Sequence, residues 1–205
     1  MNKPRVILYD NDGMVTHGGR FSEQYAKEFG IDINVMTPFF DGAFKKCLMG
    51  KADLKEELEK VLETWKWKGT VEELMRYWFS IGDTLNEDVH ASIAKLKEQG
   101  LVICLATNQE KYRIQYLADK FSYRKIFDEI FSSAELGAYK QSAEGTEKIF
   151  QTLKEKYGIL DMGEIMYWDD REKNIKSLNE KGFNAQQYRE YASFKTVLTE
   201  YGFQL

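Results

Sequence analysis

Two aspartates with one residue between them follow the apolar run "VILY", and three later apolar runs also lead into polar side chains. The residues at these places are Asp10 and Asp12, Thr107 and Asn108, Lys140, and Asp169 and Asp170. Carboxylates are the ligands that hard divalent cations prefer, and a hydroxyl and a lysine can hold the oxygens of a phosphoryl group. These residue types therefore predict a site for a divalent cation and a phosphoryl group.

The pair Asp10 and Asp12 indicates how such a site would work. A carboxylate can attack phosphorus and form an aspartyl phosphate, which divides one difficult transfer into two easier ones. Two aspartates at one strand end repel each other unless a cation or a shared proton compensates their charge. A divalent cation together with Lys140 would supply that compensation.

Short apolar segments that alternate with helical patterns predict the elements that position these residues. The predicted strands are residues 6–10, 101–107, 126–133, 164–170 and 183–188, and the predicted helices between them are residues 86–100, 142–158 and 171–182. Strands that alternate with helices in this way predict an α/β fold with a mostly parallel sheet covered on both faces. Ligands bind beyond the carboxyl ends of such strands, where the polar residues lie.

An insertion is predicted between the first and second strands, because about 90 residues without a convincing strand are far too many for a simple crossover. Segments 22–30, 52–65 and 71–79 have helical patterns. Ser22 and Thr70 are predicted N-caps, and Thr70 is followed by a glutamate at the spacing of a capping box. We therefore predict a helical cap over residues 17–83, inserted into a core of residues 1–16 and 84–205.

Composition and charge exclude several classes of protein. The 205 residues are 43% hydrophobic and 30% charged, which is typical of a globular domain with an insert. A net charge of −4 argues against a nucleic-acid partner, and no apolar run is long enough to span a membrane. Cys47 and Cys104 are expected to be reduced thiols rather than a disulfide. We expect a cytoplasmic protein, either a monomer or a weak homodimer.

Four ordered motifs resemble those of the haloacid dehalogenase-like hydrolase superfamily, in particular of its members with a helical cap between the first two motifs. They are "DNDGM", "LATN", the lysine of "LGAYKQSAE" and "WDDREKN", and the resemblance spans residues 6 to about 190. It implies a Rossmann-like parallel sheet with strand order 5-4-1-2-3, flanked by helices. The usual activity of this family is Mg²⁺-dependent hydrolysis of phosphate esters.

The resemblance also implies roles for the polar residues of the first three motifs. Asp10 would be the nucleophile, and Asp12 would be the general acid and base, its main-chain carbonyl also reaching Mg²⁺. Thr107 and the backbone of Asn108 would hold phosphate oxygens, and Lys140 would steady the nucleophile and the transferring charge. Dehalogenase members lack an acid at the position of Asp12, so its presence favours phosphoryl transfer.

The fourth motif would complete the metal site. Asp170 would bind Mg²⁺ together with Asp10, Asp169 would assist directly or through water, and Asn174 would orient these ligands. The chain departs from the family pattern at two places. Met14 stands where threonine or valine is usual, and "KQSAE" stands where many members have KPxP, so the loop that carries the lysine is less fixed.

Simpler roles remain open for some of these residues. Thr107 and Asn108 could cap the helix that follows them, and Asp169 and Asp170 could be the N-terminal charges of the next one. His17 could contact substrate near a hinge or could be an ordinary surface histidine. The following aromatic residues could line the pocket or fill the core of the cap: Trp65, Trp67, Tyr77, Trp78 and Phe79.

The function that these patterns favour is Mg²⁺-dependent hydrolysis of a small-molecule phosphate monoester, such as a sugar phosphate, through an aspartyl phosphate. A phosphomutase on the same scaffold is the main alternative, and a non-catalytic phosphate-binding or signalling protein is another. The size of the insert argues against a signalling receiver domain, which is compact. The expected partner is therefore the substrate itself, with no nucleic acid and no membrane.

Overall fold

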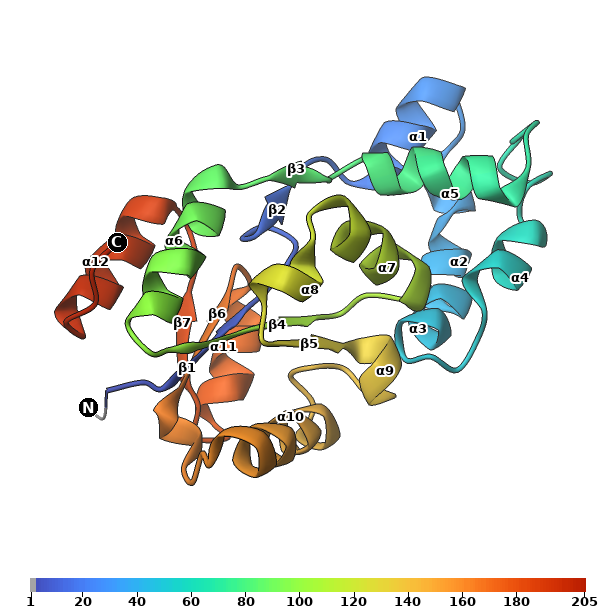
Figure 1. Cartoon of the computed structure of the whole chain (residues 1–205). Helices are drawn as coiled ribbons and strands as arrows, with labels where there is room; N and C mark the ends of the chain where they lie inside the picture. The colour runs from blue at the N-terminus through green and yellow to red at the C-terminus, as the bar shows by residue number, and fades with distance from the viewer. Residues whose placement is uncertain (1–2) are drawn as a thin grey trace.

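A five-stranded parallel sheet forms the centre of the computed structural model, which describes residues 3–205 (Figure 1). Its strands are β1 (Val6–Tyr9), β4 (Val102–Thr107), β5 (Glu129–Ser132), β6 (Ile165–Asp169) and β7 (Asn184–Gln187). They lie in the order β5-β4-β1-β6-β7, and every neighbouring pair is parallel. The α/β fold with a parallel sheet flanked by helices is thus confirmed.

The predicted order 5-4-1-2-3 counts five strands, and the structure differs from it in one detail, because the chain contains two more. Two short strands, β2 (Thr16–His17) and β3 (Thr84–Leu85), pair antiparallel outside the main sheet and enter the numbering of the chain. If only the five strands of the main sheet are numbered in chain order, the sheet reads 5-4-1-2-3 from β7 to β5. Strands of two residues have no alternation that a sequence pattern could reveal.

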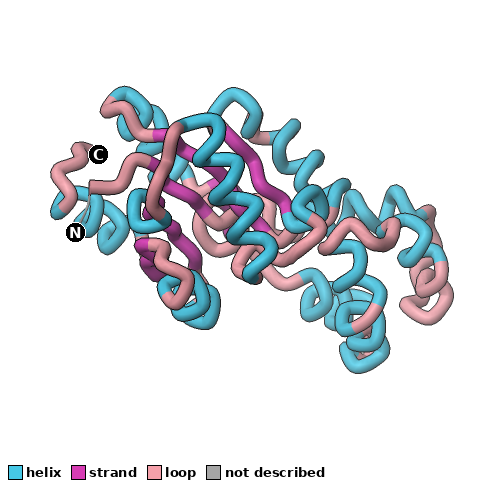
Figure 2. The backbone as a smooth tube through the Cα atoms, turned by 90° about the horizontal axis from the view of Figure 1, so that it is seen from below, coloured by secondary structure: helices cyan, strands magenta, loops and turns pink. Residues whose placement is uncertain are grey.

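Helices cover both faces of the sheet, as Figure 2 also shows from below. They are α6 (Glu87–Glu98), α7 (Lys111–Lys120), α8 (Tyr123–Ile126), α9 (Ser133–Leu136), α10 (Ala143–Tyr157), α11 (Glu172–Asn179) and α12 (Tyr191–Glu200), with a 3-10 turn at Met162–Glu164. Successive residues of a strand point to opposite faces, so Ile7 packs with α6, α7 and α12, whereas Leu8 packs with α10 and α11. Burial on both faces explains why β1 is apolar throughout.

The structure corrects the predicted start of one strand. Residues 126–133 were expected to be extended, but Tyr123–Ile126 forms α8 and the strand begins only at Glu129. Tyr123 is fully buried in the core cluster, and its ring contacts Phe127 edge-on at 5.3 Å between centroids. The tertiary packing of these two rings therefore outweighs the local extended pattern.

The inserted helices lie together at one end of the molecule, on the right of Figure 1. They are α1 (Phe21–Phe29), α2 (Thr37–Asp41), α3 (Ala43–Leu48), α4 (Leu54–Glu59) and α5 (Val71–Ser80), with a 3-10 turn at Ile33–Val35. They bury a hydrophobic cluster of their own, which contains Trp65 and Trp78. The cap limits at residues 17 and 83 stay a prediction; β2 and β3 lie next to them.

One of the two predicted N-caps in this region is correct. Thr70 accepts a hydrogen bond from the Glu73 N–H, and the Glu73 side chain accepts one from the Thr70 N–H, which is a complete capping box. Ser22 is not a cap, because α1 begins one residue earlier, at Phe21. The Phe21 ring stacks on Trp78 at 4.6 Å between ring centroids.

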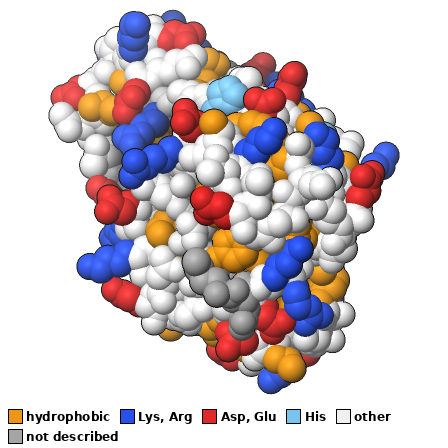
Figure 3. All heavy atoms as spheres, turned by 90° about the vertical axis from the view of Figure 1, so that its left-hand side faces the viewer, with side chains coloured by type: hydrophobic (Ala, Val, Ile, Leu, Met, Phe, Trp, Pro, Cys, Tyr) orange, Lys and Arg blue, Asp and Glu red, His pale blue; other side chains and the backbone are white. Residues whose placement is uncertain are grey.

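Two further expectations concern the cysteines and a membrane span. Cys47 and Cys104 are both buried free thiols, as expected. Within residues 3–205, no helix is long and apolar enough to cross a lipid bilayer. The described part of the face in Figure 3 carries acidic and basic side chains intermixed rather than gathered by sign.

Candidate active site

A buried lysine lies between two aspartates at the carboxyl edge of the sheet. Lys140 Nζ is 2.6 Å from Asp10 Oδ1 and 2.7 Å from Asp169 Oδ2, and it also donates to the Ala106 carbonyl at 3.0 Å. Lys140 is only 1% exposed and Asp10 only 7%. Four separate parts of the chain, the ends of β1, β4 and β6 and the loop before α10, thus meet at one ammonium group.

Burial and the neighbouring charges shift the pKa values of Asp10 and Lys140 in opposite directions. Burial raises the pKa of Asp10 to about 7, although the positive charge of Lys140 opposes that shift. Burial alone would lower the pKa of Lys140, but the Asp10 and Asp169 carboxylates outweigh it and raise the pKa. We conclude that Lys140 stays protonated and compensates part of the negative charge around it.

Both hydrogen bonds that Asp10 accepts fall on the same oxygen. Its Oδ1 receives the Lys140 ammonium and the Asn11 backbone N–H, the latter at 2.8 Å. These two donors fix the orientation of the carboxylate. The other oxygen, Oδ2, receives no donor from the described residues.

Three acids gather at this edge within reach of one another. Carboxylate oxygens of Asp10, Asp169 and Asp170 all lie within 4.8 Å of each other. Asn174 Nδ2 donates to both carboxylate oxygens of Asp169, each at 3.0 Å, and these bonds fix the position of Asp169. Asp170 Oδ1 is buried without a hydrogen-bond partner among the described residues, and burial next to Asp169 raises the pKa of Asp170.

The turn after β1 leaves just enough room for Asp170. A Cβ atom on Gly13 would lie 2.6 Å from Asp170 Oδ2, and Gly13 has a φ of +84°. Only glycine combines that backbone conformation with so close an approach. With three carboxylates, one lysine and a buried carboxylate oxygen that receives no hydrogen bond within residues 3–205, the donor set fits a hard cation such as Mg²⁺.

Asp12 is held by three donors while its side chain remains 47% exposed. Gln109 Nε2 donates to Oδ2 at 2.6 Å, and Asn11 Nδ2 and Arg113 both donate to Oδ1, at 2.9 and 3.0 Å. Asn11 is itself held by the buried hydroxyl of Tyr123, which donates to its Oδ1 at 2.8 Å. These contacts hold the carboxylate in one orientation, and it lines a cavity in front of the acid cluster.

Arg113 is the main residue of this site that the sequence motifs do not indicate. It comes from α7, and its side chain is only 10% exposed. Besides Asp12, its guanidinium donates to the carbonyls of Ile81 and Gly82, at 3.5 and 3.3 Å, in the segment that returns from the inserted helices. A lone arginine within an ordinary helical pattern gives no sequence signal of such contacts. Gln109 could have been suspected, because it directly follows "LATN".

Thr107 and Asn108 lie at the end of β4 and line the same cavity. They do not cap α7, which begins at Lys111. The buried Glu110 caps it instead by accepting the backbone N–H groups of Tyr112 and Arg113, and burial raises the pKa of Glu110 to about 7.

Asn108 instead fixes the loop that carries the lysine. Its Oδ1 accepts the Lys140 backbone N–H at 3.0 Å, and its Nδ2 donates to Gln141 at 2.9 Å. These two bonds hold the loop although "KQSAE" has no proline.

A cavity of about 960 Å³ opens in front of these residues. Its core side contains Asp10, Asp12 and Asp170, and its other side is formed by the inserted helices. The exposed His17 lies at its margin. Trp78 both lines the cavity and belongs to the hydrophobic cluster of the inserted helices, whereas Trp65 and Phe79 only fill that cluster.

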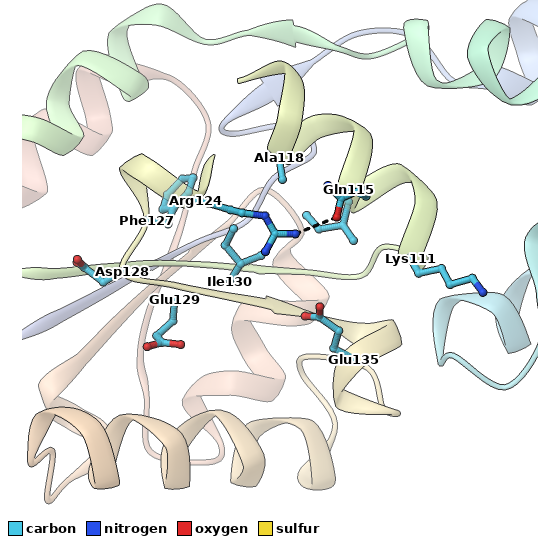
Figure 4. Close-up of a pocket in the computed structure, with 10 residues that line it drawn as sticks. Lys111, Gln115, Ala118, Arg124, Phe127, Asp128, Glu129, Ile130 and Glu135 are labelled. Carbon is cyan, nitrogen blue, oxygen red and sulfur yellow. Dashed lines mark hydrogen bonds between the residues drawn. The ribbon is translucent and has the colours of Figure 1, made fainter. Parts of the chain in front are cut away.

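A second cavity of about 440 Å³ lies between α7, α8 and β5 (Figure 4). Lys111 and Arg124 line it opposite the acids Asp128, Glu129 and Glu135. It shares no lining residue with the larger cavity. Figure 4 shows its charged side chains spread apart rather than gathered at one point, so the acid cluster of the larger cavity remains the candidate site.

Known proteins that resemble this chain share this arrangement of elements. Residues 4–182 match the family model of a haloacid dehalogenase-like hydrolase. The HAD family enzyme BT-2542 of Bacteroides thetaiotaomicron is 19% identical, with a TM-score of 0.79 over 96% of this chain and 99% of that one. The same enzyme has been solved in complex with magnesium and inorganic phosphate.

Two other solved structures extend the comparison. A predicted HAD-like family hydrolase from Porphyromonas gingivalis is 18% identical, with a TM-score of 0.77 and full coverage, 100%, of both chains. The L-2-haloacid dehalogenase of Xanthobacter autotrophicus, solved with chloropropionic acid covalently bound, is 13% identical, with a TM-score of 0.63 over 98% of this chain and 85% of that one. No curated protein matches the chain. At these identities, the similarity to solved structures concerns the fold.

Proposed function

The chain belongs to the haloacid dehalogenase-like hydrolase family, and from this premise we propose that it is a Mg²⁺-dependent phosphatase of small-molecule phosphate monoesters. The observation that carries the proposal is Asp12, an acid beside the buried Asp10, held by three donors and open to the cavity. Phosphate ester hydrolysis needs a proton donor for the leaving group and later a base for water. Haloacid dehalogenation needs no such donor, because halide leaves unprotonated.

The metal would be held by Asp10, Asp169 and Asp170, with the main-chain carbonyl of Asp12 as a further ligand. Three carboxylates gather around one lysine in this cluster, and Asp170 Oδ1 is buried without a hydrogen bond among the described residues, its nearest cation being Arg171 Nε at 4.0 Å. An added cation would compensate the excess negative charge and would give Asp170 Oδ1 a close contact. When bound, Mg²⁺ would supply positive charge that neutralises the phosphoryl oxygens and the acids around them.

The side chains of the protein would then carry out two steps. In the first, Asp10 Oδ2 attacks phosphorus, the bond from phosphorus to the ester oxygen breaks, and Asp12 gives that oxygen its proton. In the second, Asp12 takes a proton from water, the water oxygen bonds to phosphorus, and the bond between phosphorus and Asp10 breaks. Thr107 and the backbone of Asn108 would hold the other phosphate oxygens, and Lys140 would stabilise the charge that develops.

Metal dependence is the first test of this function. Hydrolysis of p-nitrophenyl phosphate should fall more than about a hundredfold after exhaustive chelation and return when Mg²⁺ is added. Release of inorganic phosphate is measured in parallel with chloride release from L-2-chloropropionate. Undiminished hydrolysis without metal would remove the ion from the mechanism, and chloride release without phosphate release would make the protein a dehalogenase.

Arg113 would be a positioning residue for Asp12, because its guanidinium joins the Asp12 carboxylate to the carbonyls of Ile81 and Gly82. In the proposed mechanism Asp12 acts in both steps, so a displaced carboxylate slows them both. The second step should suffer more when the leaving group departs without help, since water still needs a base.

Replacing Arg113 with Met should lower kcat about 10- to 100-fold, equivalent to roughly 1.4–3 kcal/mol. The fraction of enzyme phosphorylated on Asp10 at steady state should rise, and added guanidinium should restore part of the rate. The control is Arg124→Met, because Arg124 lies away from the site and donates to Gln115 (Figure 4). A lower kcat with neither a higher phosphorylated fraction nor rescue would leave Arg113 a purely structural residue.

A further inference from the structure

An aromatic wall faces the candidate nucleophile across the larger cavity. Phe40 in α2 and Phe44 and Leu48 in α3 follow one another at intervals of four residues, and all three line the cavity. The Phe44 ring lies 5.5 Å from Phe40 and 5.1 Å from Trp78, between centroids, and Trp78 stacks on Phe21. We call the four aromatic residues Phe21, Phe40, Phe44 and Trp78, together with Leu48, the aromatic wall.

The aromatic wall extends the interior of the inserted helices to the cavity: Phe21 and Trp78 are almost fully buried members of the hydrophobic cluster that also line the cavity. Phe39 and Trp65, the neighbours of Phe40 in the hydrophobic cluster, are almost fully buried and do not line the cavity. Phe40, Phe44 and Leu48 are only partly buried, so they keep apolar surface open to the cavity. Apolar surface gathered in a cleft is characteristic of a ligand site rather than of a folding core.

The polar side chains that line the cavity from residues 17–48 are His17, Arg20, Ser22 and Lys45, and two of them, Arg20 and Lys45, have acidic partners. Lys45 pairs with Asp41 at 3.0 Å, and Arg20 pairs with Glu23 at 3.4 Å, both at exposed positions. A sugar would have to exchange the water around each hydroxyl for a hydrogen bond in the site, since an unmatched polar group is costly to bury. The aromatic wall offers no such set of partners, whereas a flat ring would find ring faces and edges.

We propose that the substrate is the phosphate monoester of an aromatic or heteroaromatic alcohol, with its ring against Phe40, Phe44 and Trp78 and its phosphate at Asp10. This inference rests on the proposed phosphatase function and replaces the sugar phosphate expected from the sequence. The cavity, at about 960 Å³, is within the size range of sites that hold ligands of several rings.

The test compares esters of alcohols of similar acidity, so that the leaving group itself does not decide the rate. They are 2-naphthylmethyl phosphate, ethyl phosphate and glucose 6-phosphate. We expect kcat/KM for the naphthylmethyl ester to exceed the other two at least about tenfold. In Phe44→Ala, the ratio of the naphthylmethyl to the ethyl value should fall about tenfold. The matched control is Phe29→Ala, a partly buried aromatic of α1 that does not line the cavity and should leave the ratio unchanged.

A binding measurement makes the inference independent of turnover. Calorimetry should show 2-naphthylmethylphosphonate, which cannot be hydrolysed, binding at least about tenfold more tightly than methylphosphonate, and Phe44→Ala should remove most of that difference. Preference for glucose 6-phosphate, or an equal loss on all esters in Phe44→Ala, would overturn the aromatic substrate and leave the phosphatase intact. Tight naphthyl binding without hydrolysis of any ester would instead overturn the phosphatase.

Discussion

Asp10→Asn should abolish hydrolysis of phosphate esters, with a loss of at least about four orders of magnitude, equivalent to 5 kcal/mol or more. A neutral amide is a poor nucleophile, so no covalent phosphoryl group should form. The substitution keeps the shape of the side chain and leaves Lys140 paired with Asp169. The fold should therefore survive, and circular dichroism and thermal unfolding would verify that the loss is chemical.

Asp12→Asn should fail in a different way, because Asp12 acts as acid in the first step and as base in the second. The leaving group of p-nitrophenyl phosphate departs without protonation, so Asp10 can still be phosphorylated in this variant. No base then activates water, and the aspartyl phosphate should accumulate. Acid quenching followed by intact-mass analysis should find one added phosphoryl group on most of the protein.

The double variant Asp10→Asn/Asp12→Asn is the control for this experiment. It should carry no added phosphoryl group under the same conditions, since the nucleophile itself is gone. An adduct that persists in the double variant would mean that Asp10 is not the nucleophile. An Asp12→Asn protein that turns over normally, with no adduct, would instead show that Asp12 is not the base.

The geometry of the acid cluster followed from local patterns in the sequence. Apolar runs predict strands, and parallel strands end at one edge, so Asp10 and Asp169 had to come close together. The structure brings their oxygens within 4.8 Å, with Lys140 between them. The role of each residue in the reaction stays a prediction, because proximity alone does not reveal which group attacks.

Features that depend on distant parts of the chain were not predictable in this way. Arg113 reaches Asp12 and Gly82 only because α7 and the returning segment pack side by side. A Cβ atom on Gly18 would lie 2.1 Å from the Gly82 Cα, a close approach that appears only once both connecting segments are in place. Likewise, sequence spacing cannot tell that Phe40 faces the cavity while Phe39 faces the core.

Removal of the Lys140 charge should have two separable effects, because this ammonium serves both the fold and the proposed reaction. Lys140→Met keeps most of the side-chain volume but leaves Asp10 and Asp169 buried without their common cation. Removing one partner of a buried ion pair costs about 3–5 kcal/mol in the free energy of unfolding. Turnover should fall at least about a hundredfold, equivalent to roughly 3 kcal/mol, through loss of a charged stabiliser in a closed site.

A second substitution separates the two effects. In Lys140→Met/Asp169→Asn one of the two uncompensated charges is gone, so thermal and denaturant unfolding should show much of the stability recovered while turnover stays low. The surface control is Lys148→Met, whose exposed ammonium pairs with Glu144 and should contribute less than about 1 kcal/mol. Turnover that returned together with stability would make Lys140 a structural cation only, and near-normal turnover in Lys140→Met would mean that another group stabilises the transferring phosphoryl charge.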